Sequence, residues 1–130
     1  MIDRVTATPS AIELIRKLVR MHGPVMFHQS GGCCDGSAPM CFRQGEFRIG
    51  ENDVLLGAID GMPFYIGGAQ FEYWAHTQLI IDVVPGRGAS FSLEIPEGVR
   101  FLTRSRVFSD DECAALEKAG PPAVGPAAHL

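Results

Sequence analysis

The first pattern in the chain is a helical one near the N-terminus. Apolar residues recur there at spacings of three and four, which would place them on one face of a helix. They are Ala11, Leu14, Ile15, Leu18 and Val19. Thr8 can cap this helix and Pro9 suits its first turn, whereas Gly23 and Pro24 end it. The pattern therefore predicts a helix between Thr8 and Gly23.

After this helix, short apolar or alternating segments predict strands. They cover residues 25–29, 46–49, 54–59, 62–66, 79–84, 91–95 and 99–102. Asp60-Gly61 is a two-residue hairpin signal, and Pro63 indicates that the next strand begins there or lies at a sheet edge. In the segment 91–95, the apolar side chains are expected inside the protein, with Ser92 and Glu94 on the outer face.

Two shorter helices complete the expected elements. Residues 69–76 fit a short helix, and a capping box at residues 109–112 precedes a helix that carries Cys113. Hairpin turns predominate and no βαβ rhythm occurs, which predicts an α+β domain with mainly antiparallel or mixed sheets. We assign residues 1–118 to this single domain. Residues 119–130 are rich in Pro, Gly and Ala and are expected to form a disordered tail.

Composition and charge narrow the class of protein. The chain has 130 residues, 46% of them apolar, which fits one globular domain that can bury a core. A net charge of -4 leaves no basic excess for phosphates, which argues against nucleic-acid binding. No run of about 18 apolar residues could span a membrane, and the N-terminus has no signal-peptide pattern. We therefore expect a cytoplasmic protein.

Three of the four cysteines fall within nine positions, at Cys33, Cys34 and Cys41. Glycines beside them let the backbone fold tightly. In a reducing compartment, such a cluster more often binds metal or reacts than forms disulfides. Thiolates are soft ligands for zinc, iron or copper, and His28, five residues before Cys33, adds an imidazole. The cluster therefore predicts a transition-metal site.

Other interpretations of these residues stay open. A loop thiol could be a nucleophile or redox centre with a lowered pKa, or the thiols could pack as small apolar groups. Cys113 stands among helix formers and is expected to be a core or surface thiol. Glu72 and His76 are four residues apart, so on a helix they would share a face. They are candidate metal ligands or an ordinary surface pair.

Several blocks of the sequence resemble a family of small bacterial proteins of unknown function. The blocks are residues 23–36, 70–74, 82–88, 91–94 and 98–104. The likeness extends from Val5 to Cys113. Members of that family are often encoded beside an NAD-dependent aldehyde dehydrogenase. The resemblance therefore implies an accessory role in aldehyde oxidation, with the dehydrogenase as the protein partner.

A second, weaker resemblance is to the A-type iron–sulfur carrier proteins, which have the HesB-like fold. It is carried by a helix opening at residues 8–11, a strand, and the segment 30–34. The resemblance implies a HesB-like α+β fold and assigns iron or cluster binding to Cys33 or Cys34. Those carriers close their site with a Cys-x-Cys pair near the C-terminus, which this chain lacks, so Cys41 and His28 would replace it.

The sequence thus favours an accessory metal-binding protein over an enzyme. Cys33, Cys34 and Cys41 would supply thiolates to zinc or iron, an iron–sulfur cluster or copper, and His28 or His76 would complete the ligand set. The two alternatives are a thiol-dependent enzyme that uses a loop cysteine, and a metal-free protein that binds the dehydrogenase. Exposed strand edges are compatible with a homodimer.

Overall fold

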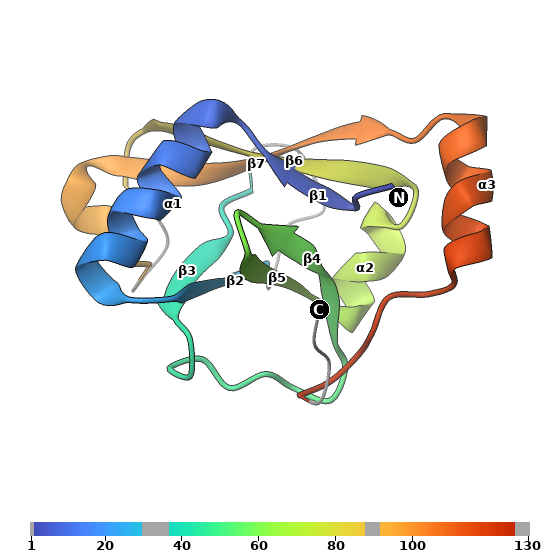
Figure 1. Ribbon diagram of the computed structural model, residues 1–130, viewed down its shortest axis with the longest axis horizontal. Coiled ribbons are helices and arrows are strands. Elements are labelled where there is room, and N and C mark those ends of the chain that lie inside the picture. The colour runs from blue at the N-terminus through green and yellow to red at the C-terminus, as the bar shows by residue number, and fades with distance from the viewer. Residues whose placement is uncertain (1, 30–36, 88–91, 127–130) are drawn as a thin grey trace.

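A computed structural model describes residues 2–29, 37–87 and 92–126 of the chain (Figure 1). These residues form an α+β fold, as expected. The elements in chain order are β1 (Val5–Ala7), α1 (Pro9–His22), β2 (Val25–Gln29), β3 (Met40–Arg43), β4 (Asp53–Ile59), β5 (Met62–Gly67), α2 (Gly68–Trp74), β6 (Thr77–Pro85), the 3-10 turn η1 (Ile95–Glu97), β7 (Val99–Val107) and α3 (Asp110–Ala119). No described helix has the length and apolar character needed to cross a bilayer.

The strands form two mixed sheets. The first has the order β1-β6-β7, in which β1 runs parallel to β6 and β6 pairs antiparallel with β7. The second has the order β3-β2-β5-β4, in which β2 and β5 are parallel and both outer pairs are antiparallel. Figure 1 shows α1 at one end of the sheets and α2 and α3 at the other. Mixed sheets agree with the expected fold class.

The main core lies between the two sheets. Phe27 of β2 packs edge-on against Phe101 of β7, with ring centroids 5.2 Å apart, and stacks on Phe64 of β5 at 5.9 Å. All three rings are fully buried. Buried aromatic rings contribute strongly to core stability through their area and their edge-to-face geometry. These contacts therefore join β2 to a neighbour in its own sheet and to the opposite sheet.

Helix α1 forms as the sequence predicts. The Thr8 side chain accepts a hydrogen bond from the Ala11 backbone N–H at 3.2 Å, which caps the first turn. Thr8 also donates to the Asp82 carboxylate at 2.9 Å, which ties the start of the helix to β6. At the other end, the Gly23 N–H donates to the Val19 carbonyl at 2.8 Å. The cap thus fixes both the helix and its position on the sheet.

The hairpin between β4 and β5 also forms where it was expected. Asp60 has φ 50° and Gly61 has φ 81°, and two positive φ values in a two-residue loop are the requirement of a type I′ turn. Pro63 lies at the start of β5, before the pairing with β2 begins at Phe64. The prediction that a strand begins near Pro63 is confirmed, but β5 is an inner strand and not an edge.

Residues 46–49 do not form the predicted strand. The strand of this region is β3, which comes earlier, and a turn follows it directly. The Glu46 N–H donates to the Arg43 carbonyl at 3.1 Å, and Gly45 has φ 92°, which favours glycine. This turn brings Phe47 back onto Phe42, with ring centroids 4.8 Å apart. Local turn geometry and aromatic packing therefore override the weak strand pattern.

The predicted strand at 91–95 is also wrong for its described residues. Ser92 and Glu94, expected on the outer face, are 3% and 0% exposed, and Ile95 begins the 3-10 turn η1. The reason is that the two polar side chains accept backbone hydrogen bonds from other strands. The Cys41 N–H donates to Ser92 Oγ at 2.8 Å, and the Phe101 N–H donates to Glu94 Oε2 at 3.2 Å.

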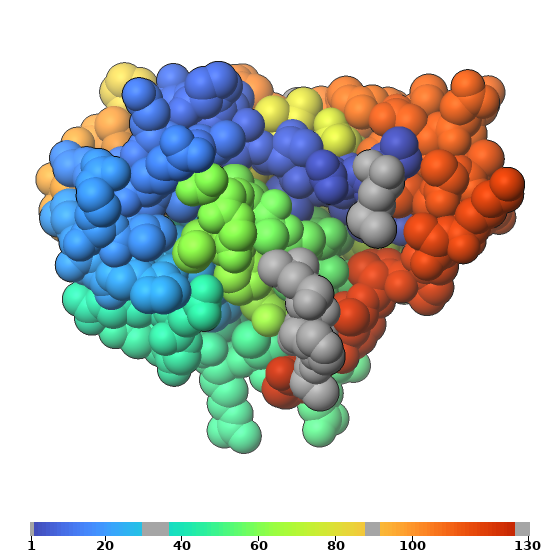
Figure 2. Space-filling model, in the orientation of Figure 1, coloured from blue at the N-terminus to red at the C-terminus, as the bar shows by residue number. Residues whose placement is uncertain are grey.

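The segment after α3 lies along the outer edge of β4. The Leu55 N–H donates to the Ala123 carbonyl at 2.9 Å, and the Gly125 N–H donates to the Asp53 carbonyl at 2.8 Å. Figure 2 shows this red segment against the green residues near position 50. Composition predicts a disordered tail over residues 119–130. Within that range, Ala119 ends α3 and residues 123–125 pair with β4, whereas residues 127–130 lie outside the described part.

Helix α3 begins with the predicted capping box. The Ser109 side chain accepts from the Glu112 N–H, and the Glu112 carboxylate accepts from the Ser109 N–H at 2.9 Å. Both nitrogens of the Arg106 fork also donate to Glu112, at 2.8 and 2.6 Å. These hydrogen bonds hold the pKa of Glu112 at about 2, below its usual range.

This cap makes a prediction about pH. Because the folded pKa of Glu112 is depressed, its stabilising contribution is complete above about pH 4.3 and is lost as the pH falls toward about 2. Glu112→Gln should therefore lower the free energy of unfolding at pH 7 and change it little at pH 2, measured by urea denaturation. Glu13→Gln on the exposed side of α1 is the control. An equal loss at both pH values would contradict the electrostatic origin.

Candidate functional site

The cysteine loop joins β2 to β3, and its two ends are fixed to β7. Gln29, the last residue of β2, accepts a hydrogen bond from the Thr103 hydroxyl at 2.8 Å. The Thr103 N–H donates to the Ser37 carbonyl, also at 2.8 Å. Gln29 and Thr103 are both buried. Cys33 and Cys34 lie between these ends, outside the described residues.

A buried polar cluster, formed by Cys41, Ser92 and Glu94, lies beside the loop's second end. Cys41 is 0% exposed, and its carbonyl accepts from the Leu93 N–H at 3.0 Å. The Ser92 hydroxyl accepts from the Cys41 N–H and donates to the Glu94 carboxylate. The Phe101 N–H donates to the other oxygen of Glu94. The cluster thus connects β3, the segment before η1 and β7.

Two acidic groups share this cluster. Burial raises the pKa of Glu94, and the hydrogen bonds from Ser92 and Phe101 oppose this only in part. Burial, and then the nearby Glu94, raise the pKa of the Cys41 thiol far above its usual range. Among the described residues, no cationic side chain forms an ion pair with Glu94. By itself, the cluster holds Cys41 as a neutral thiol.

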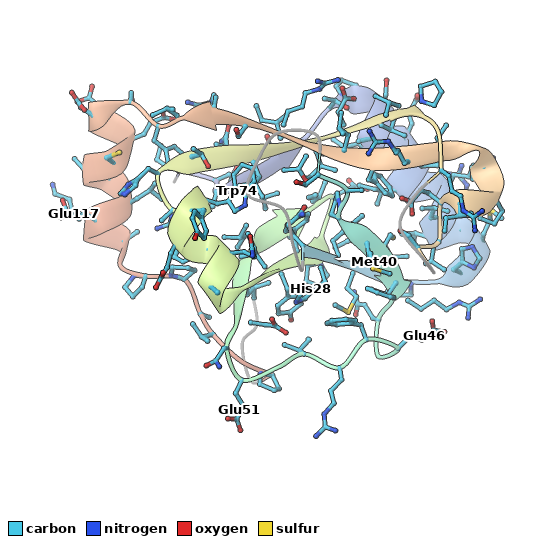
Figure 3. All side chains as sticks on the ribbon, turned by 180° about the vertical axis from the view of Figure 1, so that it is seen from behind. His28, Met40, Glu46, Glu51, Trp74 and Glu117 are labelled. Atoms are coloured by element: carbon cyan, nitrogen blue, oxygen red, sulfur yellow. The ribbon has the colours of Figure 1, made fainter. Side chains whose placement is uncertain are left out.

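His28 lies on the other face of the same sheet. Cys41 pairs with Phe27 and therefore faces the core between the sheets, whereas His28 pairs with Met40 and lies on the opposite face of its sheet (Figure 3). There, His28 Nε2 lies 2.9 Å from Asp53 Oδ1, and its ring lies 4.5 Å from that of Phe47. A single ion could not be bound by both His28 and Cys41 while β2 and β3 stay paired.

The His28–Asp53 pair is a histidine whose ring nitrogen contacts a carboxylate. A carboxylate that bonds one ring nitrogen fixes the orientation and tautomer of a histidine, as it does for many metal-bound histidines. It also satisfies a histidine that is only 5% exposed. The Gly50 N–H donates to the second Asp53 oxygen at 2.7 Å, so the same carboxylate orders the chain before β4.

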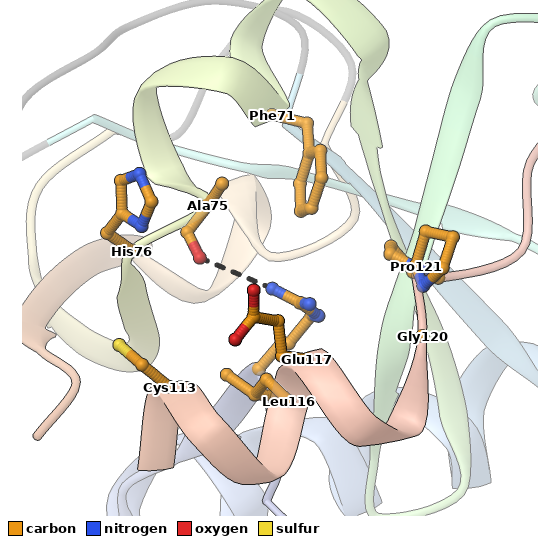
Figure 4. A pocket seen from close by; sticks show the side chains of 10 residues that line it. Phe71, Ala75, His76, Cys113, Leu116, Glu117, Gly120 and Pro121 are labelled. Carbon is orange, nitrogen blue, oxygen red and sulfur yellow. Dashed lines mark hydrogen bonds between the residues drawn. The ribbon is translucent and has the colours of Figure 1, made fainter. Parts of the chain in front are cut away.

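Among the described residues, His76 and Glu72 do not join Cys41 in a group of possible metal ligands. Helix α2 is shorter than predicted and ends at Trp74, so Glu72 and His76 do not share a helical face. His76 is five residues from Ile81, the partner of Thr103, which corresponds to roughly 16 Å along β6. Both side chains are exposed. His76 lines a different pocket, together with Cys113 (Figure 4).

Sequence reasoning missed the buried polar residues around the loop. Glu94 and Ser92 were placed on an outer face, and Gln29 and Thr103 were not considered. Gln29 did carry a signal, since it ends an otherwise apolar strand next to the glycine-rich segment. Glu94 carried none, because its burial depends on the turn η1, which brings the Phe101 N–H, seven residues later, back to the Glu94 carboxylate.

Within the described residues, no three His, Cys, Asp or Glu side chains gather closely enough to hold a metal ion. Cys41 and Glu94 provide one thiol and one carboxylate, and His28 faces away from them. A metal centre of the predicted kind therefore requires Cys33, Cys34 or both.

Comparison with known proteins assigns a family. A family model described as a domain of unknown function, DUF779, matches residues 14–107. The chain belongs to the DUF779 family. The expected resemblance to an uncharacterised family is thus confirmed. The DUF779 region includes the cysteine loop and the polar cluster, but not α3 with Cys113. No curated protein matches the chain.

The cluster predicts how Cys41 reacts. In a Cys33→Ser/Cys34→Ser variant, Cys41 should be alkylated by iodoacetamide at pH 7.5 at least about a hundredfold more slowly than Cys113, because only the thiolate reacts and Cys41 is buried. Mass spectrometry of peptides reports both sites. The same variant in urea is the control, where both thiols should react alike. Comparable native rates would show that Cys41 is accessible and ionised.

Proposed function

We propose that this DUF779 protein is a small cytoplasmic metal-binding protein. Cys33, Cys34 and Cys41 would bind one transition-metal ion at the end of the two sheets. The observation that carries the proposal is the buried pair of Cys41 and Glu94 beside the loop that contains the other two cysteines. The soft thiolates suit zinc, iron, including an iron–sulfur cluster, and copper.

The acidic groups of the cluster can respond to a cation. Without one, burial and the nearby Glu94 keep the Cys41 thiol neutral, and no described cationic side chain forms an ion pair with Glu94. A divalent ion would displace the thiol proton, because metal ligation favours the thiolate, and the ion's charge would offset the repulsion between that thiolate and Glu94. Glu94 would then complete the ligand set or accept a hydrogen bond from a residue that binds the metal.

The fixed ends of the loop support the same proposal. Gln29 and Ser37 are both tied to Thr103, and Cys41 is tied to Ser92. A metal site needs its ligands held in a defined geometry by their own hydrogen bonds. Here, the protein holds Cys41 and the two loop ends before any ligand arrives. The proposal assigns His28 a structural role, since it faces the opposite side of the sheet.

Elemental analysis tests this assignment. Protein purified under reducing conditions should contain about one transition-metal ion per chain. Cys33→Ser/Cys34→Ser and Cys41→Ser should each weaken metal binding by more than about 100-fold, because losing only a hydrogen-bond partner of a metal ligand already costs about 10-fold to 100-fold. Absorption spectra distinguish iron–sulfur or copper charge transfer from colourless zinc.

Two matched variants sharpen the metal experiment. Cys113→Ser, on α3, and His28→Gln should both keep the metal. Loss of metal in His28→Gln with retention in Cys41→Ser would assign the ion to the outer face of the sheet instead. Wild-type protein that binds neither zinc, iron nor copper would end the proposal.

The family resemblance supports a partner as well. We propose that the metal-loaded protein acts with an aldehyde dehydrogenase, as an accessory protein and not as an enzyme. The tagged chain should retain a purified NAD-dependent aldehyde dehydrogenase from the same organism in a pull-down. Retention should fall in Cys33→Ser/Cys34→Ser and persist in Cys113→Ser. Equal retention by the metal-free variant would favour a purely structural interaction, and no retention would contradict the partnership.

A further inference from the structure

A pocket of about 550 Å³ lies between α2 and α3 (Figure 4). Its walls are mainly apolar and come from both helices and from the segment that follows α3. The lining includes Arg4, Phe71, Ala75, Leu116, Glu117 and Pro121. Its volume falls within the range of small-molecule sites, about 300–1,000 Å³. The pocket therefore has the size and lining expected for a small ligand.

Arg4 brings a cation to this apolar lining. Its guanidinium donates one hydrogen bond to the Ala75 carbonyl at 3.3 Å and lies 5.3 Å from the centre of the Phe71 ring. No described carboxylate forms an ion pair with it. Arg16 and Arg106 differ, since both bond carboxylates at the surface.

The environment of Arg4 favours an anionic partner. Burial lowers the pKa of its guanidinium, whereas carboxylate partners raise the pKa of Arg16 and Arg106. A guanidinium has five N–H donors in a planar fork that matches a carboxylate. Among the described residues, only the Ala75 carbonyl accepts a hydrogen bond from this fork, so the fork can still receive a two-oxygen acceptor.

We infer that this pocket binds a small organic monocarboxylate with an aliphatic or aromatic body. Its carboxylate would bond the Arg4 fork, and its apolar body would pack between Phe71, Leu116 and Pro121. The site uses none of the residues of the proposed metal centre. The two proposals therefore stand or fall separately.

Glu117 sets the charge selectivity of the pocket. It lines the same space from α3, as Figure 4 shows, yet forms no ion pair with Arg4. A second negative charge on the ligand would meet this carboxylate, so dicarboxylates and phosphates should bind more weakly than monocarboxylates. His76, on the opposite wall, is a further polar contact for the ligand's body.

Ligand titration of the full chain tests the inference. Hexanoate and phenylacetate are the probes, and hexan-1-ol and 2-phenylethanol are neutral controls of matched shape. Backbone NMR shifts should saturate with either acid and gather at Phe71, His76 and Leu116. Each alcohol should bind at least about tenfold more weakly than its acid, because a hydrogen bond to a charged group contributes about 1.5–3 kcal/mol.

Two variants with opposite expected effects complete the test. Arg4→Met keeps an apolar stem over Phe71 and should weaken acid binding about 10-fold to 100-fold. Glu117→Gln removes the like charge and should tighten it. Thermal unfolding checks that each variant folds. If Arg4→Met does not fold, the change in acid binding in Glu117→Gln tests the inference. The inference is overturned if acids and alcohols bind alike, if the shifts lie elsewhere, or if Glu117→Gln weakens binding.

Discussion

Strand β2 is buried along its whole length, and the rest of the structure depends on meeting that constraint. Its inner face carries Phe27, which packs on β5 and β7. Met26 and His28 lie on the opposite face, where they are also buried. A buried polar side chain costs about 1–3 kcal/mol if its hydrogen bonds are lost. His28 and Gln29 therefore need partners, and these come from β4 and β7. Two polar residues in one strand thus fix elements on both of its faces.

The same constraint positions the loop chemistry. Because Gln29 is held by Thr103 at the end of β2, the glycine-rich loop leaves the sheet from a fixed point. The chain returns as β3. There, the Cys41 N–H donates to the Ser92 hydroxyl and the Cys41 carbonyl accepts from the Leu93 N–H, which holds Cys41 against this segment. A soft thiol and a carboxylate then meet in the core, and no described cation forms an ion pair with Glu94. Strands β3 and β7 thus place one thiol and one carboxylate beside a loop that carries two more thiols, which is the arrangement that the proposed function uses.

Local signals in the sequence predicted the local structure well. The Thr8 cap, the Asp60-Gly61 turn and the Ser109 capping box each depend on residues a few positions apart, and all three form. Long-range partners were beyond such reasoning. Ser92 is buried where its hydroxyl accepts from the Cys41 N–H, 51 residues away. His28 and Cys41 are separated because a strand alternates its side chains across a sheet that the sequence did not reveal. The metal-ligand set proposed from spacing alone therefore had to be divided between two faces.

The pairing of residues 123–125 with β4 amounts to strand addition in cis. An edge strand offers unpaired backbone groups to any extended peptide, including a second copy of the same protein. Here, the chain supplies its own peptide. Because that peptide is covalently connected through α3, its effective concentration at the edge is about millimolar, and a separate molecule would need a similar concentration to compete. The C-terminal segment consequently acts as a built-in competitor at that edge. Self-association of this protein through strand pairing is directed to the other sheet edges, or requires that this segment first be displaced.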